Sequence, residues 1–242
     1  ALSSAASDVY KRQMYNIQHT VTPNNGMLEV ELECIRPDME IHYTTDGSEP
    51  TATSPLYEKI VPVKEALTLK GAIFAHGRQM GKTLILPVRW NLATAKPVLG
   101  TNPTEKLLTN GIRGSLKYSD FEWCSWADND SVSFTIDLLK LEMLNTLILG
   151  CITNNGMAIH KPASVRVEVS DDNSKFREAV VQSFTSEEIF REGNFIENLS
   201  LKLGGTQARY VRVTAKGPGV CPASHVRPGQ TSRIFFDEVM LE

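Results

Sequence analysis

Residues 41–57, Ile-His-Tyr-Thr-Thr-Asp-Gly-Ser-Glu-Pro-Thr-Ala-Thr-Ser-Pro-Leu-Tyr, constrain the fold more than any other stretch of this chain. Apolar or aromatic side chains alternate with polar ones over 41–45, which is the period of a half-buried strand. Asp46-Gly47 should end that strand, because glycine accepts positive φ and an aspartate side chain can bond its own backbone. The two prolines that follow disfavour a return to a sheet ladder. The stretch therefore predicts a strand and then a tight turn.

The chain beyond residue 13 carries further strand patterns and almost no helical periodicity. Short alternating segments separated by turn signals are typical of β-sandwiches and barrels. No regular alternation of strands with helices is present, so a parallel-sheet dinucleotide-binding fold is excluded. We therefore predict an all-β protein in two parts. The expected strands are 16–22, 27–35, 40–45, 67–75 and 80–90 in the first part, and 131–138, 143–151, 164–170, 176–183, 197–203, 208–215 and 233–241 in the second.

The first part resembles the β-sandwich module that lies C-terminal to the catalytic barrel in bacterial chitobiases and β-N-acetylhexosaminidases. The family pattern I-x-Y-T-x-D-G-S-x-P-T, then S-x-x-Y, then a closing strand is matched at 41–51, Ser54, Tyr57 and 67–77. The resemblance covers roughly residues 16–92 and implies a small immunoglobulin-like β-sandwich over 14–92. It is specific for the module and only suggestive of the parent enzyme, since other secreted glycosidases carry the same module.

The second part resembles a discoidin, or factor V/VIII type C, domain. The matching segments are 108–115, 118–120 with Trp123 and Trp126, 132–138, 164–176, 208–213 and 234–241. The resemblance implies a discoidin-like jelly-roll β-sandwich over 105–242, with 93–104 as a linker. The residue pattern of 108–115 and the loop that begins at Cys221-Pro222 are similar to the C-terminal region of family-20 hexosaminidases of the Bacteroides group. Two positions depart from the pattern, because Asn110 replaces the usual aspartate and Phe121 the usual glycine.

Composition removes several classes of function. The formal net charge is −3 and no basic stripe is visible, so a nucleic-acid partner is not expected. No apolar run approaches the roughly 18 residues of a membrane-spanning helix. The four cysteines, Cys34, Cys124, Cys151 and Cys221, show no C-x-x-C spacing, and the 242-residue chain is long enough to build its cores without disulfides.

Residues 1–13 carry neither a periodic pattern nor the apolar core of a signal peptide. Their end, 8–13, resembles the translated transposase end sequence used in preparing sequencing libraries. On that interpretation the chain is a metagenomic fragment whose natural beginning is missing. A disordered linker is the alternative for a polar segment of this kind. In either case we expect this leader to be no part of the fold.

Catalysis by the hexosaminidase mechanism requires an adjacent Asp-Glu pair at the end of a barrel strand. The one tempting pair, Asp237-Glu238, lies instead in a terminal strand. Adjacent residues of a strand face opposite sides, so these two carboxylates should diverge. We therefore expect no catalytic residue in this chain.

The discoidin resemblance implies a structural calcium ion. Calcium takes six to eight oxygen ligands, and an amide in place of a carboxylate removes one negative charge. An empty loop made rigid by its glycines is the alternative. The implied ligands are the carbonyls of Leu107 and Gly111, the side chains of Asn110 and Ser115, and the carboxylate of Glu238.

Zinc is only weakly motivated. Cys221-x-x-x-His225 offers one pair of zinc-binding side chains, and a zinc site of this type normally uses three or four ligands. The sequence shows no second pair beside it, so we do not expect a zinc site here.

Carbohydrate-binding candidates lie in the loops of the second part. A flat aromatic ring can stack on the apolar face of a pyranose, while amides, imidazoles and guanidinium groups bond its hydroxyls. We expect a Trp123 platform with the His225 loop as a second wall. For Trp126 a core role is favoured, because tryptophan is usually mostly buried. The candidate residues are Trp123, Trp126, Asn155, His160, His225 and Arg227.

Together the two resemblances imply a non-catalytic C-terminal accessory fragment of a secreted glycoside hydrolase, most simply a β-N-acetylhexosaminidase. The first module would be a spacer, and the second would bind a GlcNAc- or galactose-containing glycan. The second expected partner is the catalytic barrel that would precede this fragment, on a secreted, periplasmic or cell-surface bacterial protein. A structural tail without sugar affinity, or the same modules from an α-L-fucosidase or another glycosidase, are the alternatives.

Overall fold

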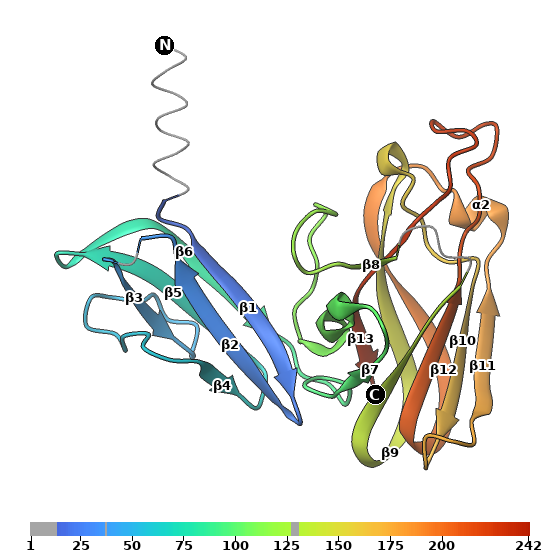
Figure 1. The fold of residues 1–242 in the computed structure, drawn as a ribbon, viewed down its shortest axis with the longest axis horizontal. Coiled ribbons are helices and arrows are strands. Elements are labelled where there is room, and N and C mark those ends of the chain that lie inside the picture. Colours follow the sequence, from blue (N-terminus) through green and yellow to red (C-terminus); the bar gives the residue numbers. More distant parts are fainter. Residues whose placement is uncertain (1–13, 37, 127–130) are drawn as a thin grey trace. The chain divides into compact units, whose positions relative to one another are not determined.

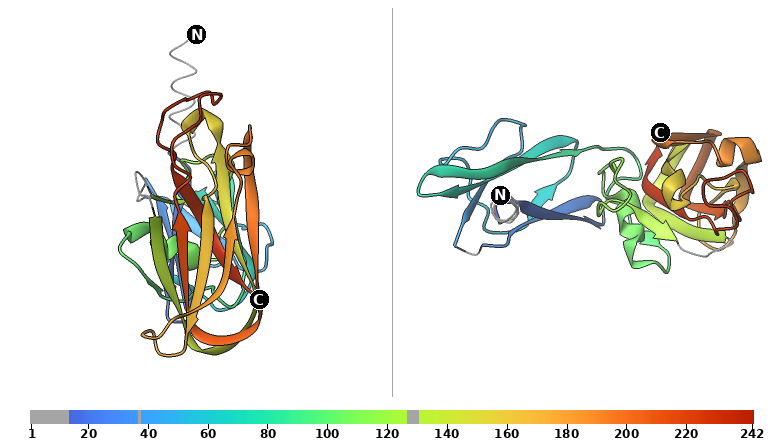
Figure 2. Two further views of the ribbon diagram at one scale, coloured as in Figure 1. Left: turned by 90° about the vertical axis from the view of Figure 1, so that its right-hand side faces the viewer. Right: turned by 90° about the horizontal axis from the view of Figure 1, so that it is seen from above.

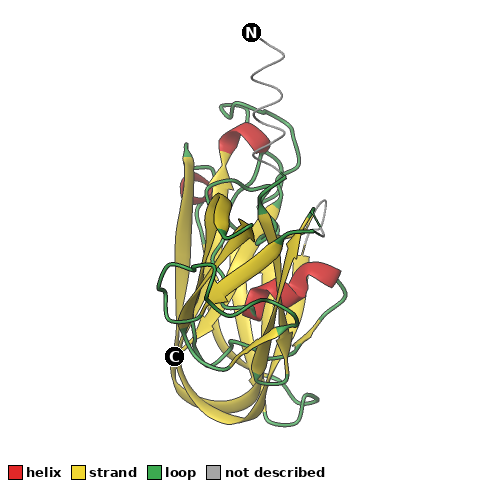
Figure 3. Cartoon of the chain, turned by 90° about the vertical axis from the view of Figure 1, so that its left-hand side faces the viewer, coloured by secondary structure: helices red, strands yellow, loops and turns green. Residues whose placement is uncertain are grey.

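The computed structural model describes residues 14–36, 38–126 and 131–242, and the leader 1–13 lies outside these ranges. The chain forms two compact units, the first built mainly on Met27–Arg89 and the second mainly on Trp90–Glu242 (Figure 1). The predicted all-β class is confirmed: strands dominate both units, and only three short helical segments accompany them in the described part (Figure 3). No helix among the described residues is long and apolar enough to cross a membrane.

The first unit is a sandwich of two three-stranded sheets. Gly71 marks a close approach of the two sheets, since an added Cβ there would lie 3.2 Å from Ile17 and 3.7 Å from Leu32 of the opposite sheet. The sheet orders are β1-β2-β4 and β3-β5-β6, with bounds β1 Ile17–Asn24, β2 Met27–Cys34, β3 Glu40–Thr44, β4 Val61–Val63, β5 Leu67–Ala75 and β6 Arg78–Val88.

The predicted strand and turn over 41–57 are confirmed. Asp46 Oδ1 accepts from the backbone N–H of Ser48 at 3.0 Å, and Gly47 adopts a φ of 78°. The prolines do not prevent all later pairing, however. The chain returns along β3 through one isolated bridge, in which the Tyr57 N–H donates to the Ile41 carbonyl at 2.7 Å.

The second unit is a jelly-roll sandwich built around two long strands that double back (Figure 1). In β9 (Ser131–Asn154) and β12 (Asn194–Lys216), the first arm of β9 pairs with the second arm of β12, and the remaining arms pair with each other. The strand order is β11-β10-β12-β9-β13-β8, with β7 beside β9. The other elements are β7 Val98–Leu99, η1 Pro103–Thr109, β8 Cys124–Trp126, η2 Asn155–Met157, β10 Ser164–Ser170, β11 Arg177–Ser183, α2 Ser186–Ile189 and β13 Ile234–Leu241.

The strands of the second unit surround a common apolar interior (Figure 2). Phe134 and Ile136 on the first arm of β9 and Leu147 and Leu149 on the second arm are each at most 1% exposed. The two arms therefore contribute to the same core. Because β9 and β12 both double back, their four ends lie at one end of the sandwich together with the beginning of β13. The connections between those ends form the loops that carry most of the candidate site.

The predicted linker over 93–104 is wrong. Ala93 is fully buried in the core of the second unit. Val98 and Leu99 form β7 and pair with Ile136 and Thr135 of β9. The segment lacks strong alternation because it contains only a two-residue strand, turns and the beginning of η1, so its sequence resembled that of a connection.

Candidate functional site

A pocket of about 120 Å³ lies among the loops at one end of the second unit; we call it the loop-end pocket. It is formed where η2 follows β9, where the chain leaves α2, and where the β12–β13 connection folds back. A pocket for a drug-sized ligand has a volume of roughly 300 Å³ or more. The loop-end pocket is smaller, so it can hold only one end of a longer ligand. Its lining residues are Asn155, Phe190, Glu192, Pro222, Ser224, His225 and Val226.

Asn155 and His225 form the fixed polar part of the loop-end pocket. Asn155 Oδ1 accepts from the Gly193 N–H at 2.9 Å, and its Nδ2 lies 3.3 Å from His225 Nε2. His225 Nδ1 accepts from the backbone N–H of Arg227 at 3.0 Å. Both side chains are 8% exposed, so backbone contacts hold these two polar groups in place before any ligand arrives.

His160 lies behind this pair and is fully buried. Its ring centroid is 4.9 Å from that of His225 and 5.0 Å from that of Phe190, both in edge-to-face geometry. Burial, together with the neighbouring His225 and against an opposing contact with the Ile189 backbone, lowers the pKa of His160 to about 4, so the imidazole is neutral at physiological pH. Among the described residues, neither ring nitrogen makes a hydrogen bond of normal geometry.

Of the predicted sugar-binding residues, the structure thus brings together Asn155, His160 and His225. Arg227 contributes its backbone N–H to His225, while its side chain is directed to Gln230 Oε1 at 3.3 Å.

The prediction of an exposed Trp123 platform is wrong. Trp123 is 5% exposed, packs with Ile152 and Phe235, and donates its indole N–H to the Ser115 carbonyl at 3.1 Å. The sequence could not show this, because the neighbours that bury the ring come from distant strands. The remainder of that loop, 127–130, lies outside the described residues.

Trp126 is a core residue, as favoured from the sequence, and not a sugar platform. It is 8% exposed, stacks on Phe134 at 6.2 Å between ring centroids, and meets Phe236 edge to face at 5.6 Å.

The exposed aromatic of this region is Phe121, with 91% of its surface accessible. Its loop is joined to the beginning of β12 by a 3.4 Å hydrogen bond from Asn194 Nδ2 to the Leu116 carbonyl. In the sequence, Phe121 stood out only because it replaces the usual glycine. Because the family usually has glycine at this position, no side chain is needed there for the core. A large apolar side chain at such a position was therefore the signal for an exposed aromatic platform.

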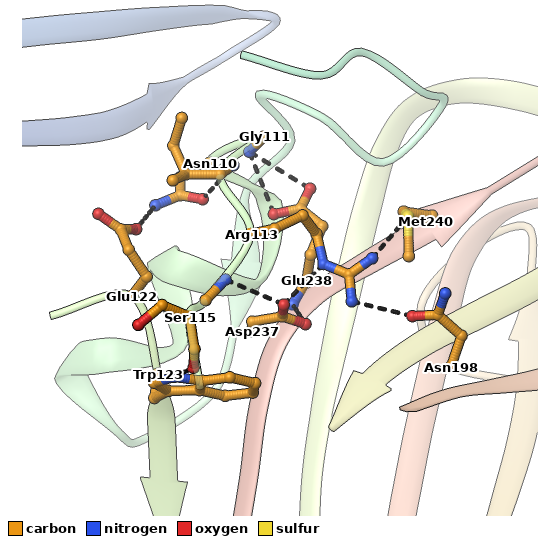
Figure 4. A network of polar contacts seen from close by, with 12 residues as sticks. Asn110, Gly111, Arg113, Ser115, Glu122, Trp123, Asn198, Asp237, Glu238 and Met240 are labelled. Atoms are coloured by element: carbon orange, nitrogen blue, oxygen red, sulfur yellow. Dashed lines mark hydrogen bonds and ion pairs between the residues drawn. The ribbon is translucent and has the colours of Figure 1, made fainter. Parts of the chain in front are cut away.

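The second candidate centre is a group of buried carboxylates on β13, drawn in Figure 4. Asp237 is fully buried and accepts from Arg113 Nε at 2.6 Å and from the Gly114 N–H at 3.0 Å. Burial raises the pKa of Asp237 in spite of the opposing Arg113 charge. Arg113 also donates to Asn198 Oδ1 at 2.9 Å, so one guanidinium joins the loop after η1 to β13 and β12.

Glu238 points away from Asp237 and toward the turn after η1 (Figure 4). Its two oxygens accept from the Gly111 N–H at 3.3 and 3.1 Å, and the residue is 1% exposed. Burial raises the pKa of Glu238 well above its ordinary value, and the negative charge of Asp237 adds to the effect. The predicted divergence of the two carboxylates is confirmed, since each accepts from different partners.

The implied calcium ligands fit this centre in part. Glu238, Gly111 and Asn110 lie together, and the Leu107 carbonyl accepts from the Asn110 N–H at 3.4 Å. Within the described ranges, no basic side chain forms a salt bridge with Glu238, so its ionised form is favoured only by the Gly111 N–H and by the more distant charge of Arg113. A cation would suit such a carboxylate.

Ser115 is engaged elsewhere. Its hydroxyl accepts from the Lys117 N–H at 3.1 Å and its own N–H donates to Asp120 at 2.8 Å. The Asn110 amide also spans two partners, because Oδ1 accepts from the Ile112 N–H and Nδ2 donates to Glu122, each at 2.9 Å.

Each of the two units matches a different known domain family. Residues 23–84 match the chitobiase/beta-hexosaminidase C-terminal domain. Residues 93–226, more than half of the 242-residue chain, match the F5/8 type C domain. The chain belongs to the F5/8 type C domain family. Both resemblances inferred from the sequence are thereby confirmed, and the second unit is referred to below as the F5/8 type C unit.

Solved structures show weaker similarity to this F5/8 type C protein. CpGH89CBM32-6 of Clostridium perfringens is 18% identical, with 63% of this chain and 98% of that one covered and a TM-score of 0.42. The Streptococcus pneumoniae fucose binding module SpX-3 is 18% identical, with 63% and 97% covered and a TM-score of 0.39. The C-terminal domain of a chitobiase from Bacteroides fragilis is 16% identical, with 54% and 76% covered and a TM-score of 0.33. Comparison with curated proteins gives no match.

Proposed function

We propose that the F5/8 type C unit is a carbohydrate-binding accessory domain of an extracellular glycoside hydrolase, most specifically of a β-N-acetylhexosaminidase. The loop-end pocket carries the proposal. It combines a fixed Asn155–His225 pair with the apolar face of Phe190 and the carboxylate of Glu192. Sugars are recognised by this combination of a few oriented polar groups and an aromatic wall. The chitobiase-type first unit supports a hexosaminidase parent and acts as a spacer.

The buried carboxylates support an accessory role rather than a catalytic one. Asp237 and Glu238 are 0% and 1% exposed, and each is already bonded to groups of the loop after η1. A general acid must reach the glycosidic oxygen of its substrate. These two side chains hold the fold together and do not face an open cleft.

Glycan binding is tested by screening the full chain on a glycan array and then titrating the best GlcNAc- or galactose-containing ligand. We expect an affinity on the order of 0.1–1 mM, which corresponds to roughly 4–5.5 kcal/mol. Glu192→Gln should weaken binding because it removes the charge from a hydroxyl acceptor in the pocket. Phe121→Ala should weaken it by about 0.5–1.5 kcal/mol, because the exposed ring is free to stack on the sugar.

Met143→Ala is the matched control, because Met143 is also an exposed apolar side chain but lies on β9 beside Gln207. We expect it to bind like the wild type. A wild-type chain that binds nothing on the array would instead support the structural-tail alternative.

We further propose that calcium binds between Glu238 and the turn after η1. The Glu238 carboxylate, the carbonyls of Leu107 and Gly111, and the Asn110 amide oxygen would hold it. The ion would neutralise a buried carboxylate and join this turn to β13. A ligand that binds only the folded state raises its stability, so a chelator should lower the melting temperature. Asn110→Asp should enlarge the calcium-dependent shift, because it adds a negative charge.

The pH dependence supplies the control for calcium. Because the folded state holds the Glu238 proton more tightly than the unfolded chain, the contribution of Glu238 to the stability of the metal-free unit is fully present below the ordinary pKa of 4.5. That contribution is lost as the pH rises through the raised pKa. In chelator, Glu238→Gln should therefore stabilise the unit at neutral pH and abolish the response to calcium. Equal melting temperatures with and without chelator in the wild type would remove calcium from this centre.

A further inference from the structure

Three metal-binding side chains meet beside the loop-end pocket. The ligand atoms of His160, Cys221 and His225 all lie within 4.8 Å of one another. Their residues are 0%, 3% and 8% exposed, so the group is almost entirely shielded from solvent. Sequence reasoning saw only the pair Cys221 and His225 and lacked a further ligand, which the fold supplies from the connection after η2.

His160 is the observation that points to a ligand. Its imidazole is fully buried, and neither ring nitrogen makes a hydrogen bond of normal geometry within the described part of the chain, although the backbone of Ile189 lies close enough to act on the ring. A buried polar group without a partner destabilises the folded state, so such groups are rare and require an explanation. A ring that only filled space against Phe190 would be better replaced by an apolar one. A metal ion bound to one nitrogen gives the buried imidazole the partner that it lacks.

The backbone already holds the two segments in register. The His160 N–H donates to the Arg233 carbonyl at 3.1 Å, and the Arg233 N–H donates to the Ala158 carbonyl at 2.9 Å. Across the other loop, the Cys221 N–H donates to the Gln230 carbonyl at 2.9 Å. These bonds are independent of any metal, so the three side chains are brought together by the fold itself.

We propose that His160, Cys221 and His225 form a zinc site, with a water molecule as the fourth ligand on the side of the loop-end pocket. Two imidazoles and a thiolate are ligands that zinc prefers, whereas calcium requires oxygen. Distances of about 2.0–2.1 Å to nitrogen and about 2.3 Å to sulfur place tetrahedral ligand atoms roughly 3.3–3.6 Å apart. Because the ligand atoms all lie within 4.8 Å of one another, the side chains would have to close in by at most about 1.5 Å.

The surroundings are compatible with a bound ion. Ser232 Oγ lies 3.4 Å from Cys221 Sγ and can donate a hydrogen bond to the thiolate. His225 must give up one present contact, either the Arg227 N–H on Nδ1 or the Asn155 amide on Nε2. Zinc is normally four-coordinate, and where the protein supplies three ligands a water molecule takes the fourth position. The zinc site does not depend on the proposed sugar binding.

The test uses the full chain after removal of any affinity tag and of bound metal. Zinc titration should show one equivalent bound per chain. Cobalt, used as a coloured substitute, should give the thiolate-to-metal charge-transfer absorption and the visible bands of a tetrahedral site. Cys221→Ser should abolish the charge-transfer absorption, and His225→Gln should abolish binding of the single equivalent. Cys34→Ser, which removes a thiol from the first unit, should leave both signals unchanged.

The cobalt spectrum of the unaltered chain keeps the test independent of whether the variants fold. Absence of zinc uptake, uptake without the thiolate absorption, or equal uptake by the Cys221→Ser chain would each overturn the proposal. Excess calcium should not displace the cobalt, which separates this site from the one at Glu238. Glycan binding can fail without affecting any of these results, so the two proposals are distinguished.

Discussion

Replacing Asp237 with alanine is expected to destabilise the F5/8 type C unit by about 3–5 kcal/mol, as removal of one partner from a buried ion pair does. Asp237 is fully buried and accepts from Arg113 Nε at 2.6 Å and from the Gly114 N–H at 3.0 Å. Its loss would leave Arg113 Nε and the Gly114 N–H without their acceptor. Because Arg113 also binds Asn198, the loop after η1 should loosen from both β13 and β12.

Urea unfolding followed by tryptophan fluorescence measures this effect in the full chain. All three tryptophans, Trp90, Trp123 and Trp126, belong to the second unit, so the signal reports on that unit. Glu178→Ala is the matched control, because Glu178 pairs with Arg166 at 3.2 Å with both side chains about half exposed. An exposed pair of this kind contributes little. Equal shifts of the midpoint for the two variants would mean that burial of the Asp237 pair has no energetic consequence.

The fold was predictable because its main signals are local. Alternation of side chains and the Asp46-Gly47 turn depend on neighbouring residues, and the structure follows them. The expected strands 131–138 and 143–151 are the two arms of one continuous β9. The bend between them occurs near Leu139, which adopts a φ of 69°, a conformation that leucine gives no reason to expect. The arms could be predicted from the sequence, whereas their continuity could not.

The candidate sites were harder to predict, because burial depends on residues far apart in the chain. A polar neighbourhood in the sequence suggested that Trp123 is exposed, yet Ile152 and Phe235 cover it. His160 was one of several loop histidines, and only the return of the β12–β13 connection brings Cys221 to it. By contrast, the association of Glu238 with Gly111 was implied by the family resemblance and is present. Contacts that a known family fixes can be carried over, while contacts particular to this chain require its own structure.

Replacing Trp126 with alanine is expected to destabilise the F5/8 type C unit by about 3–5 kcal/mol, because it opens a cavity in a close-packed core. The ring stacks on Phe134 and meets Phe236, which belong to two different strands. Loss of the ring should therefore weaken the contact between β9 and β13 and also the contacts that β8 makes with both strands. Far-UV circular dichroism is the appropriate measurement, since the substitution removes one of the fluorescent reporters.

The same measurement on Trp123 and Phe121 decides which aromatic side chain of this loop is free to bind a ligand. Trp123→Ala should also destabilise the unit by about 3–5 kcal/mol, because its ring is buried against Ile152 and Phe235. Trp123→Phe keeps most of the ring but loses the indole hydrogen bond to Ser115, and should cost about 0.5–1.5 kcal/mol for that bond. Phe121→Ala should leave the unfolding midpoint unchanged, because the side chain is 91% exposed.

A Trp123→Ala chain with wild-type stability would show that the ring contributes nothing to the core and would return Trp123 to the list of sugar platforms. Loss of stability in Phe121→Ala would show that this side chain packs against the domain in solution. The expected order of destabilisation, with Trp126→Ala and Trp123→Ala far above Trp123→Phe and Phe121→Ala lowest, follows directly from burial. It leaves Phe121 as the one aromatic of the three whose removal can change glycan binding without changing the fold.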